Sequence, residues 1–435
     1  MRNKHLYIET YGCQMNEYDS DRIRNALGAE TTDNPAEADI IIINTCAIRD
    51  KADQKAFSSL GKYKHLKSNN PDLIVGISGC VAQLYGEKLL HRIPHLDFVL
   101  GPRAIPRLPE LIKKIENEKK RAVETSYDIE ELFDVEPYHS QGNVTAFVSV
   151  QQGCNKRCSY CIVPRVRGDE VNRPLEDILR ETRNLVDKGV REVTFIGQTV
   201  NSWKENGYKF GDLLRAAADV DNLERIRFTT SYPRDITGRM IEAVRDVPKI
   251  CRHLHLPVQS GSNSILGKMR RTYTREWYSD IVKRLRDALP DMAVTTDIII
   301  GYPGETEGDF RDTMSLLEEI EFEGAFSFKF SPRPGTPAAA LPADETVDED
   351  TASRRLYMLQ SYQRDITMRK NRGRVGYIEE VLAEGTSKND PEFLTGRTSH
   401  NRITHFRGDS ALSGKMLKVR ITEGLFNSLR GELSV

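Results

Sequence analysis

Residues 151–164 read QQGCNKRCSYCIVP and come at the end of the apolar, strand-like run AFVSVQ. The stretch places Cys154, Cys158 and Cys161 in the pattern CxxxCxxC, so three thiolates can converge on one small site. Three cysteines can hold a 4Fe–4S cluster and leave one iron without a protein ligand, because full cysteine ligation needs four. Structural zinc also needs four ligands, and no further Cys or His lies nearby in the sequence. The pattern therefore predicts an iron–sulfur cluster with one open iron.

Six strand-like runs alternate with helical segments from residue 144 onward, and the CxxxCxxC motif follows the first of them. The intervening stretches, such as residues 174–189 and 306–322, show the periodicity of amphipathic helices. Such alternation is typical of a parallel barrel, and eight units would complete a TIM barrel. With six units, we expect an open (β/α)6 barrel. The runs are AFVSVQ, EVTFIG, RIRFTTS, HLHLPV, AVTTDIIIG and AFSFKFS.

The N-terminal region, residues 1–122, also alternates between strands and helices, and a cysteine follows each of three strands. The carboxyl ends of parallel strands meet at one sheet edge, where α/β proteins build their sites. We therefore expect Cys13, Cys46 and Cys80 to converge, with Gly12 and Gly79 permitting tight turns before two of them. Three buried structural thiols are the alternative interpretation. The strand-like runs are LYIET, DIIIIN and LIVGIS.

Two three-cysteine sites predict two 4Fe–4S clusters, each with an open iron. One cluster can deliver an electron, since cluster potentials reach down to about −700 mV, whereas zinc has no redox chemistry. The open iron of one could chelate S-adenosylmethionine, and that of the other could carry a sulfur for transfer. The chain has seven cysteines, an odd number that argues against a disulfide framework. Cys251 has no comparable setting, and we interpret it as a core thiol.

The remaining segments predict a linker, a long helix and a small barrel. Residues 123–143 are rich in Asp and Glu and are interpreted as an acidic linker, with a surface loop as the alternative. A charged helix is expected over 348–372, and the tail contains five short strands separated by turns, as in an OB-type barrel. The predicted domains are 1–122, 123–143 (linker), 144–372 and 373–435.

Charge and hydropathy restrict the class of protein. The 435 residues carry a net charge of −1, but 15 Lys and Arg oppose nine Asp and Glu from Arg354 onward. This basic tail suggests an RNA contact, although ordinary surface charge explains it equally well. No apolar run approaches the ~20 residues that span a bilayer, and MRNKHLYIET has no signal-peptide core. We expect a cytoplasmic protein without a membrane partner.

Several motifs resemble those of a known family, the radical S-adenosylmethionine methylthiotransferases. CNKRCSYC resembles the radical S-adenosylmethionine signature, and YGCQMNEYDS, NTCAIRDKADQK and GISGCVAQ resemble the N-terminal methylthiotransferase domain. GRTSHNRITHF and NSLRGELSV resemble a TRAM domain, which is an OB-like all-β barrel. NTCAIRDKADQK and HLPVQSGSNSILGKMRRTYT are closer to the MiaB-type branch, which acts on tRNA, than to the ribosomal-protein branch.

The resemblance implies a reaction and its partners. One S-adenosylmethionine would donate a methyl group to a sulfide on the N-terminal cluster, and a second would be cleaved to a radical at the CxxxCxxC cluster. The substrate would be isopentenyladenosine beside the tRNA anticodon, methylthiolated at carbon 2. An electron donor such as flavodoxin or ferredoxin and a sulfur or Fe–S carrier are expected, with a monomeric enzyme. Alternatives are threonylcarbamoyladenosine in tRNA, a ribosomal protein, or an RNA-binding module with structural clusters.

Further site residues follow from matching positions and from the basic tail. His253 and His255 alternate on one strand and are interpreted as structural. Cofactor contacts are predicted mainly at the ends of barrel strands, where glycines let the backbone approach a ligand. Basic residues around the tail strands predict a phosphate-contacting face. The predicted cofactor-binding residues are Tyr160, Gly197, Gln198, Gln259, Ser260, Asp297, Gly304 and Glu305, and the RNA-binding residues are Arg397, Asn401, Arg402, Arg407, Lys415 and Lys418.

Overall fold

A computed structural model describes residues 4–48, 50–127, 132–140, 142–388 and 390–434. The chain divides into two compact units, and each is described by itself. The first unit holds residues 1–140, 151–157 and 161–173, and the second holds residues 141–150, 158–160 and 174–435. The division passes through the CxxxCxxC motif, so Cys154 and Cys161 belong to the first unit and Cys158 to the second.

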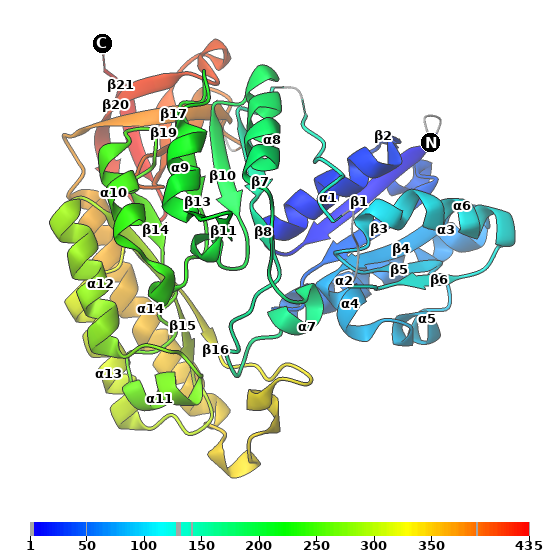
Figure 1. Cartoon of the computed structure of the whole chain (residues 1–435), viewed down its shortest axis with the longest axis horizontal. Helices are drawn as coiled ribbons and strands as arrows, with labels where there is room; N and C mark the ends of the chain where they lie inside the picture. Colours follow the sequence, from blue (N-terminus) through cyan, green and yellow to red (C-terminus); the bar gives the residue numbers. More distant parts are fainter. Residues whose placement is uncertain (1–3, 49, 128–131, 141, 389, 435) are drawn as a thin grey trace. The chain divides into compact units, whose positions relative to one another are not determined.

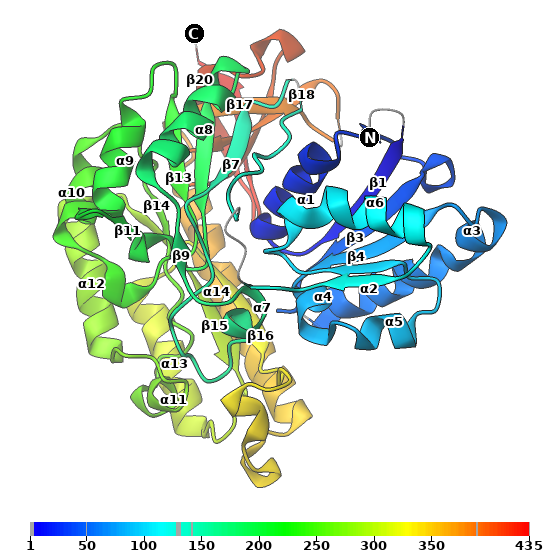
Figure 2. The ribbon, with the colours of Figure 1, turned by 45° about the vertical axis from the view of Figure 1, so that its right-hand side comes forward.

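The first unit is built on a six-stranded parallel sheet in the order β2-β1-β3-β4-β5-β6. Strand β3, IIIINT, is buried along its whole length because helices cover both faces of the sheet (Figures 1 and 2). Ile40 and Ile42 pack with α1 and α6, whereas Ile41 and Ile43 pack with α2, α4 and α5. The elements are β1 (His5–Tyr11), α1 (Gln14–Leu27), β2 (Glu30–Thr31), β3 (Ile40–Thr45), α2 (Asp50–Lys62), α3 (Lys64–Asn69), β4 (Ile74–Gly79), α4 (Cys80–Tyr85), α5 (Lys88–Arg92), β5 (Phe98–Leu100), α6 (Leu108–Glu118) and β6 (Ala122–Glu124), with β8 (Gln151–Gln152), α7 (Val163–Arg167) and β9 (Val171–Asn172) added from the motif region.

The segment expected to be a linker is folded onto the first unit where the structure describes it. Residues 122–124 form the edge strand β6, and Tyr138 N donates to Asp21 O at 2.9 Å. Arg22 Nε donates to Val135 O at 3.0 Å, so backbone groups of the segment bond to residues of α1. The described part of this segment therefore contacts the first unit, as a surface loop would, and the linker over 123–143 stays a prediction; residues 128–131 and 141 lie outside the described residues.

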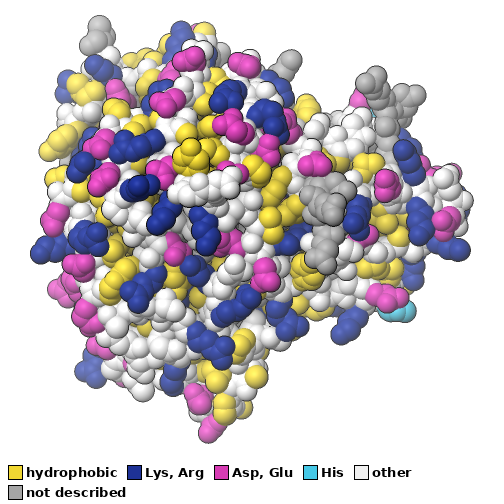
Figure 3. Space-filling model, in the orientation of Figure 1, with side chains coloured by type: hydrophobic (Ala, Val, Ile, Leu, Met, Phe, Trp, Pro, Cys, Tyr) yellow, Lys and Arg dark blue, Asp and Glu magenta, His cyan; other side chains and the backbone are white. Residues whose placement is uncertain are grey.

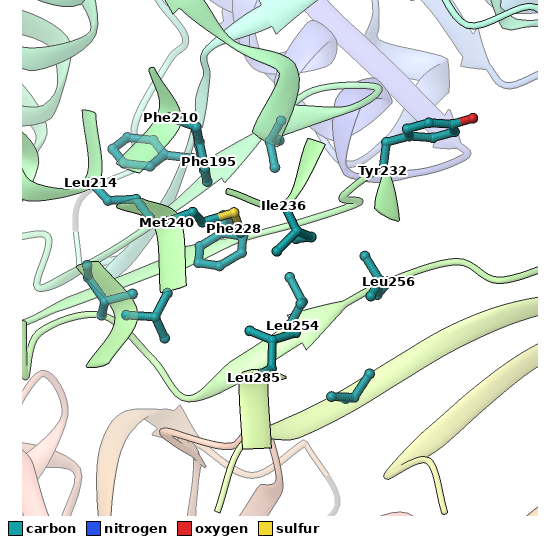
Figure 4. Packing of buried hydrophobic residues seen from close by; sticks show 14 of the residues in the cluster. Phe195, Phe210, Leu214, Phe228, Tyr232, Ile236, Met240, Leu254, Leu256 and Leu285 are labelled. Carbon is teal, nitrogen blue, oxygen red and sulfur yellow. The ribbon is translucent and has the colours of Figure 1, made fainter. Parts of the chain in front are cut away.

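The second unit contains the open barrel that was predicted. Strands β7, β10 and β13 form one parallel sheet and β14, β15 and β16 another, and a bridge between Ile226 and Ile250 joins them. Aromatic side chains fill the layer between strands and helices, where the Phe210 and Phe228 rings meet edge to face at 5.3 Å (Figure 4). The elements are β7 (Thr145–Ser149), α8 (Leu175–Asp187), β10 (Glu192–Ile196), β11 (Lys204–Glu205), β12 (Tyr208–Lys209), α9 (Phe210–Ala218), β13 (Arg225–Phe228), α10 (Gly238–Asp246), β14 (His253–His255), α11 (Asn263–Lys268), α12 (Arg275–Ala288), β15 (Ala293–Ile300), α13 (Glu307–Ile320), β16 (Gly324–Lys329) and α14 (Glu349–Arg372).

The tail forms a closed five-stranded barrel in the order β17-β18-β19-β21-β20. It docks on the larger barrel through two buried arginines of β13. Arg225 Nη1 donates to Arg397 O at 2.5 Å, and Arg227 Nη2 donates to Thr398 O at 2.8 Å. Cys251, next to this contact, is buried as predicted. The strands are β17 (Ile378–Thr386), β18 (Phe393–Thr398), β19 (Ile403–Arg407), β20 (Met416–Gly424) and β21 (Leu429–Leu433).

Among the described residues, no helix is both long enough and apolar enough to cross a membrane.

Candidate metal and cofactor sites

Three adjacent strands deliver the N-terminal cysteines to one edge of the sheet. Cys13 is the N-cap of α1, Cys46 follows β3, and Cys80 is the first residue of α4. Because β1, β3 and β4 are parallel neighbours, their carboxyl ends lie side by side. A Cβ on Gly12, the residue before Cys13, would lie 2.9 Å from Cys46 Cβ, and both Cys13 and Cys80 raise the pKa of Cys46. The structure therefore brings together the three thiols that the sequence singled out, here called the N-terminal trio.

Close backbone packing fixes the turns that carry the N-terminal trio. A Cβ on Gly12 would lie 2.4 Å from Asn16 Oδ1, and Gly79 has a φ of 91° with Asn44 Oδ1 only 2.4 Å from the position of its missing Cβ. Asn16 Nδ2 donates to Asn44 Oδ1 at 3.1 Å, and both amides are buried. Asn16 also receives a hydrogen bond from the Cys13 thiol at 3.5 Å. The sequence analysis missed this amide pair, although both asparagines lie in the quoted cysteine motifs.

The electrostatics of the N-terminal trio favour thiolates at Cys13 and Cys80 and the protonated thiol at Cys46. The pKa of Cys13 falls to about 6, first through a hydrogen bond from Cys46 and then through the charge of Arg167. The pKa of Cys80 falls to about 7 for the same two reasons in the same order. Cys46, which donates to both, has its pKa raised by those hydrogen bonds and by burial. Thiolates are the form that binds metal.

Arg167 itself is held in place by residues far away in the sequence. Its Nη2 donates to Asp19 Oδ2 at 2.7 Å, and its carbonyl oxygen accepts from Arg103 Nε at 2.8 Å. Burial lowers the pKa of Arg167, but the charges of Asp19, Cys80 and Cys13 outweigh burial and raise it. Its position at the end of α7 places this arginine in the same unit as the N-terminal trio.

The CxxxCxxC cysteines are held by different partners on either side of the unit boundary. In the first unit, Cys154 N donates to Gly168 O at 3.1 Å, and Cys154 Sγ accepts from Lys156 N at 3.4 Å. In the second unit, Cys158 Sγ accepts from Arg271 Nη1 at 3.3 Å. Arg271 is fixed by Nε donating to Tyr273 Oη at 2.7 Å and Nη2 donating to Pro257 O at 2.9 Å.

Strands β14, β15 and β16 present a polar and aromatic inner face within the second unit. His253 Nε2 and His255 Nδ1 both hydrogen-bond Thr295 Oγ1 at 3.0 Å, and His255 Nε2 lies 3.4 Å from Asp297. Thus the two histidines share a face, as expected, and hold a defined network. Phe326, paired with Asp297 in the strand register, packs edge to face on His255 and is 57% exposed. An exposed phenylalanine beside this network can receive an apolar or planar ligand group.

The predicted cofactor contacts fall into different environments within the second unit. Gln259 has a φ of 77° and bridges to Ile298 through its backbone, which fixes the strand end. Ser260 is buried and accepts from Ser262 N at 3.2 Å. Tyr160 packs in a small apolar cluster with Tyr302. Gly197 is buried and Gln198 is partly exposed after β10.

Two of these predicted contacts already have structural partners. The buried carboxylate of Glu305 accepts from Arg355 Nη1 at 2.8 Å, and burial raises its pKa to about 6 against the lowering effect of that arginine. Gly304 has a φ of 75°, and its missing Cβ would lie 2.0 Å from Lys268 Nζ. Asp297 faces the network on the inner barrel face. A cofactor contact therefore stays a prediction for each of these residues.

The arginines of the predicted RNA-binding face are paired with glutamates. Arg402 Nη2 lies 2.5 Å from Glu323, so this residue helps to dock the small barrel on the larger one. Arg407 lies 2.8 Å from Glu392. Figure 3 likewise shows Lys and Arg interleaved with Asp and Glu over the visible face. The remaining predicted contacts are Arg397, which lies 3.5 Å from Glu384 and donates to Asn401, and Lys415 and Lys418.

The donor chemistry fits iron–sulfur clusters better than a single ion. Among the described residues, no group of three His, Cys, Asp or Glu side chains is arranged to hold one metal ion. A 4Fe–4S cube binds each thiolate through a different iron, so three thiolates need not share one point. The thiol-only donor set and the adjacent guanidinium of Arg167 suit such an anionic cube at the N-terminal trio.

Sequence comparisons agree with the architecture and cover nearly the whole chain. A protein of Haemophilus influenzae (strain PittGG) named tRNA-2-methylthio-N(6)-dimethylallyladenosine synthase is 45% identical over 437 residues, covering 98% of this chain and 92% of that protein. The chain belongs to this synthase family. Identically named relatives of the family in Aromatoleum aromaticum and Saccharophagus degradans are 45% and 46% identical and cover 99% of this chain, with 99% and 96% of their own lengths matched.

Three domain families match the chain in the expected order. The uncharacterized protein family UPF0004 matches residues 5–101, the radical SAM superfamily matches residues 148–317, and the TRAM domain matches residues 372–434. The predicted fold class of N-terminal α/β domain, open radical SAM barrel and small TRAM barrel is thereby confirmed. Membership of the radical SAM superfamily implies S-adenosylmethionine and a 4Fe–4S cluster as cofactors.

Solved structures share the fold of this chain at low sequence identity. The radical S-adenosylmethionine methyltransferase TsrM from Kitasatospora setae, with tryptophan and a SAM analogue bound, has a TM-score of 0.58 and 15% identity, covering 78% of this chain and 75% of that one. The cobalamin-dependent radical enzyme OxsB has a TM-score of 0.53 and 13% identity, covering 83% and 56%. At this level of identity, these similarities support the fold and nothing beyond it.

Proposed function

We propose that this chain methylthiolates carbon 2 of isopentenyladenosine next to the tRNA anticodon. The observation that carries the proposal is the combination of near-complete similarity to named synthases with two separate cysteine trios in one chain. A radical SAM enzyme that only cleaves its cofactor needs one such trio. The second trio, at the parallel-strand ends of the first unit, supplies the place for a sulfur-carrying cluster.

The proposal assigns the two trios different tasks. Cys154, Cys158 and Cys161 would hold the cluster at which S-adenosylmethionine is cleaved, and the N-terminal trio would hold a second 4Fe–4S cluster. When bound, these cofactors supply the methyl group, the sulfur and a radical strong enough for an unactivated aromatic C–H bond. The protein contributes thiolate ligands, their hydrogen-bond partners and a shaped barrel interior.

The inner barrel face suits the proposed base. Asp297 and the two histidines supply polar groups, while Phe326 and Phe328, 57% and 38% exposed, offer apolar faces on the same side of β16. An isopentenyl group and an adenine ring both bury apolar area against such side chains. We assign this face to the modified base, with the prenyl group against the phenylalanines.

The TRAM barrel would contact the tRNA backbone, leaving the base to the larger barrel. Two basic residues of the predicted face, Lys415 and Lys418, form no ion pair with the residues that the structure describes. A low-potential protein such as flavodoxin or ferredoxin would supply electrons, and a sulfur or Fe–S carrier would replenish the N-terminal site. We propose a monomer that works in the cytoplasm, where its tRNA substrate is found.

Nucleoside mass spectrometry tests the function directly. Bulk tRNA from cells lacking this gene should contain isopentenyladenosine without its methylthio derivative, and the wild-type gene should restore the derivative. Cys46→Ala should fail to restore it, whereas Cys251→Ala, which removes a buried thiol outside both trios, should succeed. Unchanged methylthio-isopentenyladenosine on deletion, in a cell without a second copy, would show that the substrate is different.

Metal analysis tests the cofactor assignment independently of activity. After anaerobic reconstitution, the wild-type chain should contain about eight iron atoms, four for each cubane. Cys46→Ala should contain about half as many, and Cys251→Ala should match the wild type. Stoichiometric zinc without iron would contradict the proposal.

A further inference from the structure

A buried arginine from the loop after Cys161 bonds to α1, the helix that begins after Cys13. Arg167, the last residue of α7, is 2% exposed and belongs to the same unit as the trio. Its Nη2 donates to Asp19 Oδ2 at 2.7 Å, and Asp19 is itself 1% exposed. Asp19 lies on α1, whose N-cap is Cys13, and Val166, the residue before Arg167, packs in the same buried cluster as Cys80.

A second arginine, Arg22, lies beside Asp19, and Arg167 keeps one hydrogen-bond donor without a partner in the described part of the chain. Arg22 Nη1 lies 3.9 Å from Asp19 Oδ1, and its other nitrogens donate to the carbonyl oxygens of Leu132 and Val135. Arg167 Nη1 is buried and has no hydrogen-bond partner among the described residues. A buried donor without a partner is costly, so an acceptor bound beside it would be stabilising.

A purely structural role explains this arrangement poorly. Placing a guanidinium in the interior costs several kcal/mol unless it is fully paired, and an apolar side chain of similar size often serves packing as well. Three thiolates and the cluster that they hold, in contrast, carry negative charge. A fixed positive charge beside them is therefore stabilising, and more strongly so where water is excluded.

We propose that Arg167 is a positioning residue whose buried positive charge raises the reduction potential of the cluster held by the N-terminal trio. The inference rests on the proposed function, because it takes the trio as cluster ligands. Reduction adds negative charge, and nearby positive charge or a hydrogen bond to a ligand sulfur favours the reduced state. One loop thereby provides Cys161 to one site and the charge of Arg167 to the other.

A redox titration of the isolated N-terminal cluster tests the proposal. The full chain carrying Cys154→Ala, Cys158→Ala and Cys161→Ala is reconstituted, and the cluster potential is followed by electron paramagnetic resonance. In this parent, Arg167→Met should shift the midpoint to a more negative value, and Arg167→Lys should recover part of the shift. Asp19→Asn removes a negative charge and should shift the midpoint the opposite way. Arg165→Met, an exposed arginine on the same helix, is the matched control and should not shift it.

The opposite signs separate electrostatics from packing. A structural disturbance would move both variants in the same direction, and that result, or no shift in either variant, would overturn the proposal. If Arg167→Met does not retain a cluster, iron content decides: recovery of loading in Arg167→Lys supports the charge, and equal failure of both overturns it. A parent chain without any cluster would instead refute the proposed function, so the two failures are distinguishable.

Discussion

Arg355 Nη1 lies 2.8 Å from Glu305 Oε1, and this buried pair joins α14 to the loop that follows β15. Arg355 also donates through Nη2 to Glu307 at 3.1 Å. The pair therefore fixes the end of a barrel strand at which a cofactor contact was predicted. Because both partners are nearly inaccessible to water, neither can be removed without leaving the other poorly solvated.

Arg355→Met should destabilise the chain by about 3–5 kcal/mol, the usual cost of leaving a buried charge without its partner. The neighbouring exposed Arg354→Met is the matched control and should change the free energy of unfolding by less than about 0.5 kcal/mol. Urea unfolding followed by circular dichroism measures both. Equal stability of the two variants would show that the Glu305–Arg355 pair does not contribute.

The raised pKa of Glu305 predicts a pH dependence with a definite sign. Burial raises it to about 6, above its ordinary value of 4.5, so the folded chain retains a proton that the unfolded chain has lost. The contribution of this group to stability is therefore highest at low pH and falls by about 2 kcal/mol as pH rises through 6. Glu305→Gln has no carboxyl group to titrate and does not lose this stability. Its free energy of unfolding relative to that of the wild type should therefore rise by about 2 kcal/mol between pH 4 and pH 7. A constant difference over that range would contradict the raised pKa.

A substitution in the turn before Cys80 should disrupt the N-terminal trio although no cysteine is replaced. Gly79→Ala would place a Cβ 2.4 Å from Asn44 Oδ1 and 2.5 Å from Thr45 O at a positive φ, so the turn must move. Reconstituted chain should then lose about half of its iron, the share of one cubane. Gly28→Ala also has a positive φ but meets nothing within 4 Å, and it should retain full iron. Full iron in Gly79→Ala would mean that the turn tolerates the clash.

The sequence predicted the elements and the N-terminal trio because their determinants are local. The long helix was expected over 348–372 and spans Glu349–Arg372, with Asp348 capping it by accepting from Thr351 N at 2.9 Å. Convergence of Cys13, Cys46 and Cys80 followed from strand ends alone. Pairs such as Arg167–Asp19, 148 positions apart, and Arg271–Cys158, 113 apart, depend on which loops meet in space. Neither the periodicity nor the spacing of residues in the sequence predicts which of these loops come into contact.

The tail residues also show where sequence reasoning reached its limit. A basic strand face predicts RNA contact, but charge counting could not reveal that Arg402 is used against Glu323 at the contact between the two barrels. Acidic partners on other elements decide which basic residues are available. Lys415 and Lys418 therefore carry the prediction better than the arginines do.

Removing Lys415 and Lys418 should weaken tRNA binding through lost phosphate contacts. Each contact contributes about 0.7–0.9 to the slope of log affinity against log salt, so the double alanine variant should reduce the slope by about 1–2. Filter binding of isopentenyladenosine-containing tRNA over a salt series measures it. Lys283→Ala, an exposed lysine on α12, should leave the slope unchanged. An unaltered slope in the double variant would place the RNA elsewhere.

Phe326→Ala should weaken recognition of the prenyl group while S-adenosylmethionine cleavage continues. The Phe326 side chain is exposed on the inner barrel face and contacts His255, so its removal deletes apolar area that an isopentenyl group would cover. A lost contact of about 1–3 kcal/mol corresponds to a roughly 10–200-fold smaller kcat/KM for prenylated tRNA. Deoxyadenosine formed without tRNA, measured by chromatography, should be unchanged. Tyr357→Ala removes an aromatic ring that is 74% exposed on α14, and it should retain wild-type kcat/KM. Equal loss of methylthiolation and of deoxyadenosine formation in Phe326→Ala would instead place this phenylalanine against the cofactor.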